Sequence, residues 1–198
     1  MIWWLRAHAT AAWAATLAAC FICCPLLATS SIPTLSLFSG ASGSIPVPLV
    51  LPVFPACVLL YGLNRTPWQA HATAVREMRY WTSGAVAITG VAALAVAFAE
   101  AALLDFPLSF AVARNLIGYL GVGLLVQYVS NAQYGAVAVA AIPVVCGLIG
   151  TGPGGRPYPW MWPAQPYESV TAAGAAIFLF CSGMLFTAST VKSKRTHV

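Results

Sequence analysis

The chain has 198 residues, of which 60% are hydrophobic and 7% charged, and its mean hydropathy is +0.84. A soluble domain of this size could not keep so much apolar surface out of water, whereas a lipid bilayer removes the conflict. The net charge of +5 is modest, so it points to lipid headgroups rather than to nucleic acid.

Long apolar stretches predict the fold. One membrane span needs about 20 mostly apolar residues, so the chain has room for about six spans and for no separate soluble domain. The expected fold is all-α: a polytopic membrane protein whose residues 1–198 form one transmembrane domain. The expected spans are residues 7–28, 45–63, 82–103, 110–129, 136–149 and 169–190.

The first apolar run could be a signal peptide, but it is longer than such a segment normally is, and we expect a retained span. Trp3 and Trp4 precede it as interfacial anchors, and a Ser-, Gly- and Pro-rich external loop is expected over 29–43. The second span contains four prolines, which remove backbone donors. It is therefore expected to be short, kinked and buried among other helices.

A short amphipathic helix is expected over residues 67–79, between the second and third spans. Thr66 can cap its start, Pro67 suits the first helical position, and Gln69 lies where a capping box places it.

Basic residues predict the orientation. Seven of the nine Lys and Arg form three clusters next to span ends, and short basic segments stay on the cytoplasmic side. Both termini are thus expected in the cytoplasm, with the protein in the plasma membrane and with Arg114 and Arg156 outside. The clustered residues are Arg6; Arg65, Arg76 and Arg79; and Lys192, Lys194 and Arg195.

Glu100, Asp105 and Arg114 form the one charged group near membrane depth, and the hairpin of the third and fourth spans could bring them together near the outer surface. Charges in a span are costly and usually paired. They could form a gate or a substrate contact, or a structural ion pair that fixes the hairpin. Gly118, Gly121 and Gly123 could serve a subunit interface or packing within the chain, and the spacing favours neither.

Other chemistry-bearing residues show no catalytic or metal-binding arrangement. The six cysteines lie in expected spans, where they read as small apolar side chains; Cys20, Cys23 and Cys24 share one helix face, but no further ligand accompanies them. The histidines lack a partner carboxylate. Arg156 follows a Gly-rich stretch without a phosphate-binding ending, and Trp160 and Trp162 suit the outer interface better than a ligand site. No catalytic residue, metal or cofactor is expected.

These absences restrict the function. A gradient-driven carrier needs ionisable or polar groups near the bilayer midplane, and an enzyme needs a nucleophile, a base or a metal. The sequence offers none of these. A chain of this kind that moves a substrate is expected to take its energy from a partner.

Six spans, cytoplasmic termini, an amphipathic helix after the second span and a Gly-, Pro- and Trp-containing outer loop resemble the membrane subunit of an ABC-2-type exporter. The stretches Ala113–Gly121 and Pro159–Pro163 are similar to small six-span proteins of high-GC Gram-positive bacteria. Some of these accompany ABC ATPases, including in peptide-antibiotic export and self-immunity systems.

The resemblance implies a separate ABC ATPase that docks on the helix 67–79, with Trp68 as the apolar contact and Arg76, Glu77 and Arg79 as the polar contacts. It also implies a homodimer, or a heterodimer with another permease, around an apolar path for an amphipathic or hydrophobic substrate. The alternative is a non-transporting scaffold, an accessory or immunity protein that binds a partner protein or a lipid-bound peptide.

Overall fold

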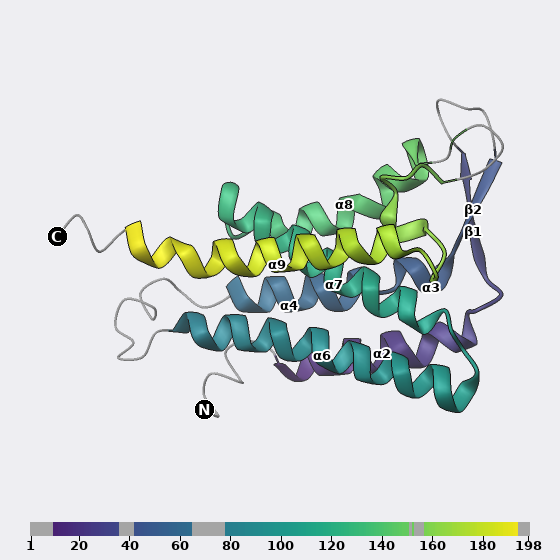
Figure 1. The fold of residues 1–198 in the computed structure, drawn as a ribbon, viewed down its shortest axis with the longest axis horizontal. Coiled ribbons are helices and arrows are strands. Elements are labelled where there is room, and N and C mark those ends of the chain that lie inside the picture. The colour runs from purple at the N-terminus through teal and green to yellow at the C-terminus, as the bar shows by residue number, and fades with distance from the viewer. Residues whose placement is uncertain (1–9, 36–41, 65–77, 151, 153–156, 194–198) are drawn as a thin grey trace.

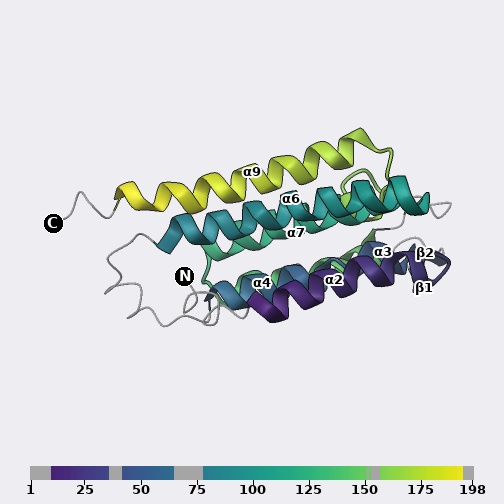
Figure 2. The same cartoon turned by 90° about the horizontal axis from the view of Figure 1, so that it is seen from below.

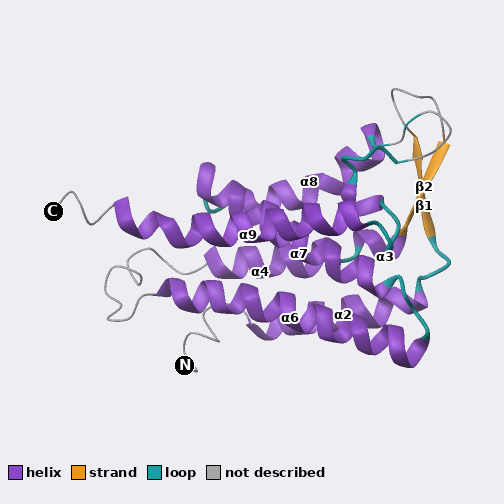
Figure 3. Cartoon of the chain, viewed as in Figure 1, coloured by secondary structure: helices purple, strands orange, loops and turns teal. Residues whose placement is uncertain are grey.

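The computed structural model describes residues 10–35, 42–64, 78–150, 152 and 157–193 (Figure 1). This part of the chain is helical apart from one short hairpin and the connecting loops (Figure 3). Four helical segments are long and apolar enough to cross a membrane: Val47–Asn64, Thr82–Leu104, Ser109–Val129 and Val170–Thr187. The protein is therefore a helical membrane protein, as the apolar runs predict.

The elements follow one another in a simple order. In chain order they are α2 (Thr10–Leu26), β1 (Ser31–Leu35), β2 (Ser42–Pro46), α3 (Val47–Val50), α4 (Val53–Asn64), α6 (Met78–Leu104), α7 (Ser109–Val129), α8 (Tyr134–Ile149), the 3₁₀ turn η2 (Trp162–Ala164) and α9 (Val170–Ser193). The first and fifth expected spans correspond to α2 and α8, which are apolar but have only 17 and 16 residues.

The segment expected to be a loop between the first two spans contains an antiparallel hairpin, which corrects that expectation. β1 pairs with β2 so that Ser31 lies opposite Pro46 and Leu35 opposite Ser42. The serine and glycine content of this segment suggested only a loop. The pairing of β1 with β2 instead gives backbone N–H and C=O groups of the two strands hydrogen-bond partners. Pro33 is tolerated because both strands of a two-stranded sheet are edges.

The proline-rich second span is broken into two helices, α3 and α4, as its prolines predict. Pro52 lies at the break and has no N–H, so the carbonyl of Pro48 loses the donor that a continuous helix would supply. The thiol of Cys24 in α2 lies 3.9 Å from that carbonyl oxygen. Pro48 and Pro52 are both buried, so the break lies inside the bundle, where neighbouring helices can satisfy the freed groups.

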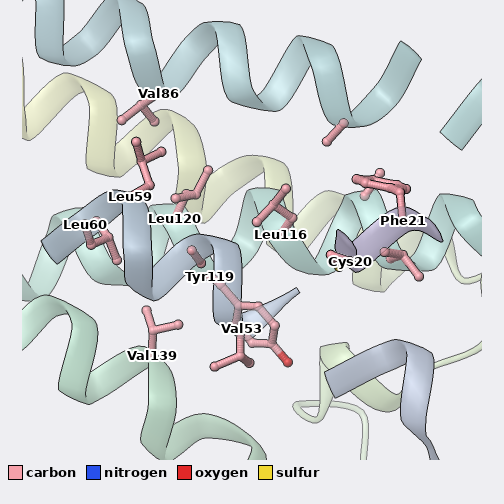
Figure 4. Close-up of a cluster of buried hydrophobic side chains, with 14 of the residues drawn as sticks. Cys20, Phe21, Val53, Leu59, Leu60, Val86, Leu116, Tyr119, Leu120 and Val139 are labelled. Atoms are coloured by element: carbon pink, nitrogen blue, oxygen red, sulfur yellow. The ribbon is translucent and has the colours of Figure 1, made fainter. Parts of the chain in front are cut away.

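Helix α7 is the centre of the molecule. Every residue from 111 to 121 is buried, and α7 packs against α4, α6, α8 and α9. In Figure 2, α6 and α9 lie on one side, while α2, α3 and α4 lie on the other. Figure 4 shows the resulting core, in which Leu116 and Leu120 of α7 lie among side chains of the surrounding helices.

The helices run along one common direction, so the bundle has two ends (Figure 1). The hairpin end carries β1–β2, the turn 105–108 and the segment 157–169. The opposite end carries the start of α6 and the last turn of α9. Arg79 lies in the first turn of α6 and Lys192 in the last turn of α9, so these two basic positions share one end.

Candidate functional site

The strongest polar arrangement in the described structure surrounds Arg114, near the start of α7. Its side chain is only 6% exposed. The guanidinium donates hydrogen bonds to three backbone carbonyl oxygens at 2.9–3.1 Å, and all three acceptors lie in residues 162–166, in η2 and directly after it. The acceptors belong to Trp162, Gln165 and Pro166. One side chain of α7 therefore holds the segment 157–169 in place.

Asn115 extends this arrangement to a third part of the chain. Its Nδ2 donates to the carbonyls of Pro163 at 2.8 Å and Leu49 at 3.1 Å, and its Oδ1 accepts from Nε of Arg114 at 3.3 Å. Leu49 lies in α3, directly before the proline break. We call Arg114, Asn115 and these five carbonyls the latch, because together they join α7, α3 and the segment 162–166.

The structure does not bring Arg114 together with Glu100 and Asp105. Each guanidinium nitrogen is occupied by the latch, and no ion pair joins the three residues in the described structure. Asp105 is exposed in the turn after α6, where its φ of 51° is a conformation that aspartate tolerates better than most residues. The α6–α7 hairpin places the three residues near one end, with Arg114 and Glu100 buried and Asp105 exposed.

Trp160 and Trp162 lie in different environments. Trp160 is 51% exposed and stacks on Tyr158, with ring centroids 6.3 Å apart. The ring of Trp162 instead lies over Gly118 of α7 and 5.3 Å from the ring of Tyr119. Trp160 is thus exposed to the surroundings, whereas Trp162 anchors the segment 157–169 on α7. Arg156 lies outside the described residues.

The expected docking helix is not covered by the structure. Trp68, Arg76 and Glu77 lie outside the described residues, and Arg79 belongs to the first turn of α6. The ATPase contact therefore stays a prediction.

The glycines of α7 pack within the chain. A Cβ on Gly121 would lie 2.5 Å from backbone atoms of Leu179 and Phe180 in α9, and one on Gly118 would overlap the ring of Trp162. A Cβ on Gly123 would overlap Leu60 of α4. Of the two roles that the spacing left open, the structure gives these glycines contacts between helices of one chain.

In the described ranges, histidine, cysteine, aspartate and glutamate form no group of three or more that could hold a metal ion. Nor does the latch offer a nucleophile or a base: a guanidinium and a carboxamide bound to carbonyls are structural donors. Its donors hold backbone carbonyls of neighbouring elements in place.

No protein-family model matches the chain, and no curated protein or solved structure matches it either. Its function has to be inferred from its own residues.

Sequence reasoning singled out Arg114 but missed Asn115 as a site residue. The available signal was the adjacent polar pair inside an otherwise apolar helix, since polar side chains at membrane depth need partners. What the sequence could not indicate was that backbone carbonyls, rather than Glu100 and Asp105, supply the acceptors for Arg114.

The contact between Trp162 and Gly118 gives a test of how the segment 157–169 is anchored on α7. We expect Trp162→Leu to lower stability by about 3 kcal/mol by leaving a cavity, and Gly118→Ala to lower it by about 2 kcal/mol through overlap with the ring. In the double variant the added methyl fills part of the space left by the ring. Thermal unfolding of all four proteins in detergent should show a double variant at least about 1 kcal/mol more stable than the sum predicts. Strict additivity would mean that the two positions do not share this contact.

Proposed function

We propose that this chain is the membrane-spanning subunit of an ABC-type exporter. It would move an amphipathic or hydrophobic substrate, such as a peptide or antibiotic, with energy from a separate ATPase. The observation that supports the orientation required by this proposal is the common location of the start of α6, with Arg79, and the end of α9, with Lys192 (Figure 1). Basic residues at one end of a bundle favour that end as the cytoplasmic face.

In this proposal α2 and α8 join the four longer segments to make six spans in the plasma membrane, and both termini are cytoplasmic. At about 1.5 Å per residue, these two helices reach about 24–26 Å, slightly less than a typical hydrocarbon core of about 30 Å. Local thinning of the bilayer accommodates such a difference at modest cost. The hairpin end, with the latch, then faces outward.

A non-transporting scaffold, such as an accessory or immunity protein, is the second candidate. It is favoured by the latch and by the glycine contacts, which fix α7 against its neighbours on several sides. A partner protein or a lipid-bound peptide would then bind the outer end, where Tyr158 and Trp160 are exposed.

Charge reversal in the expected docking helix separates these two functions. The tagged chain is purified in mild detergent from its own host, and copurifying proteins are identified by mass spectrometry and tested for ATP hydrolysis. We expect an ABC ATPase with the wild type, and a loss of at least about tenfold with Arg76→Glu/Arg79→Glu, since two charge contacts become repulsive.

Lys192→Glu/Lys194→Glu is the matched control, because it makes the same change in charge in the C-terminal basic cluster, outside the sequence of the expected docking helix. It should retain the ATPase. Equal loss in both variants would contradict docking through residues 67–79. A wild-type chain that purifies without any ATPase would contradict the exporter proposal and favour the scaffold.

A further inference from the structure

Glu100 is a buried carboxyl that the latch does not use. It lies on the inner face of α6 with Ala93 and Ala97, which are completely buried, while Phe98 on the outer face is 68% exposed. The Glu100 side chain is 9% exposed, and its buried Oε2 has no hydrogen-bond partner in the described structure. It lies four positions before the end of α6 at Leu104, which is about 6 Å along the helix axis.

Within the part of the chain that the structure describes, the elements around this carboxyl supply no neutralising cation. On α7, Arg114 is bound to the carbonyls of the segment 157–169. In the turn after α6, Asp105 carries a negative charge and is exposed. On α2, the neighbouring titratable groups are thiols, of which Cys24 interacts electrostatically with Glu100. The hydroxyl of Ser109, at the start of α7, donates to the carbonyls of Ala97 and Phe106.

An isolated carboxylate in an apolar membrane interior costs several kcal/mol and is normally neutralised. A basic side chain, a metal ion or a proton can do this. Among the described residues, Arg114 is engaged elsewhere, and Glu100 and the thiols form no group that could hold a metal ion. A single buried carboxyl oxygen without a neighbouring donor can bind a proton, so the proton is the neutralising ligand that fits this site.

We propose that Glu100 is a proton-binding site in the membrane domain, on the inner face of α6 at the hairpin end. In the packed bundle the carboxyl holds a proton. If the packing around the inner face of α6 loosens and admits water, the carboxyl can release the proton, so this packing is coupled to the proton concentration on that side. The inference depends on the membrane fold alone and does not depend on the exporter proposal.

A hydrophobic carbodiimide tests for this proton directly. The carboxyl proton moves to a carbodiimide nitrogen while the carboxylate oxygen bonds to the central carbon, and the O-acylisourea then rearranges to a stable N-acylurea. The adduct contains every atom of the reagent, so no other reactant is needed. An ionised carboxylate has no proton to give and reacts poorly.

The experiment labels the full chain in lipid vesicles from about pH 6 to about pH 9 and maps adducts by mass spectrometry. We expect an adduct on Glu100 that decreases by about tenfold per pH unit above its midpoint, and that the variant Glu100→Gln lacks. The exposed Asp105 and Glu168 serve as internal controls and should remain largely unlabelled. Absence of the Glu100 adduct near neutral pH would overturn the proposal, as would protection of Glu100 by Na⁺, since that would identify a metal cation instead.

Thermal stability gives a second readout. If the folded chain holds a proton that the unfolded chain releases, stability decreases as pH rises. The wild type should show this decrease, Glu100→Gln should not, and Asp105→Asn should behave as the wild type. A wild-type stability curve identical to that of Glu100→Gln would also contradict the proposal.

Discussion

Replacing Arg114 with methionine is expected to release the segment 157–169 from α7 and to destabilise the protein by about 3–5 kcal/mol. Methionine fills similar space but donates no hydrogen bond, so the carbonyls of Trp162, Gln165 and Pro166 lose their charged donor. A hydrogen bond to a charged group contributes about 1.5–3 kcal/mol, and the three are not fully additive. The stability of Arg114→Lys should lie between that of the wild type and that of Arg114→Met, because a single ammonium cannot reproduce the planar set of donors of the guanidinium.

Two measurements check this expectation. Thermal unfolding in detergent should show a midpoint about 6–20 °C lower for Arg114→Met, and hydrogen exchange should accelerate in residues 157–169 before it does in α7. Asp105→Asn is the control, since it removes a charge at the same end without touching the latch. Unchanged hydrogen exchange in residues 157–169 of Arg114→Met would show that the latch does not hold this segment.

Adding one methyl group at Gly121 is expected to separate α7 from α9. The new Cβ would lie 2.5 Å from the backbone carbon of Leu179 and the backbone nitrogen of Phe180, and main-chain atoms cannot rotate away as a side chain can. A Cβ on Gly183 of α9 would in turn lie 2.8 Å from the carbonyl oxygen of Gly121. Overpacking of this kind costs about 3 kcal/mol, so Gly121→Ala should lower the unfolding midpoint by about 6–12 °C.

The chain contains matched controls for this variant. A Cβ at Gly84 of α6 or Gly174 of α9 would meet nothing within 4 Å, so Gly84→Ala and Gly174→Ala carry the same chemical change without the clash. Both should leave stability unchanged or raise it by up to about 1 kcal/mol, because alanine favours a helix more than glycine does. A loss in the controls as large as that in Gly121→Ala would refute the idea that close packing of α7 on α9 causes the effect.

The sequence by itself determined the class of protein and the rough position of its helices. Apolar runs of span length predict helices because the bilayer leaves few other ways to satisfy the backbone, and α6, α7 and α9 lie within a few residues of the expected ranges. The break between α3 and α4 also follows from local chemistry, since Pro52 cannot donate to the carbonyl of Pro48 wherever the segment lies. These features depend on neighbours in sequence.

Tertiary structure alone decided the partners. The acceptors for Arg114 lie 48–52 residues away in sequence, and those for Asn115 lie 48 and 66 residues away, so no spacing pattern indicates them. Which neighbour each residue of α7 contacts depends on how α3, α9 and the segment 157–169 pack around this helix. The same packing turns Gly121 toward α9 and leaves Oε2 of Glu100 buried without a partner, although both residues lie in helices that the sequence predicts.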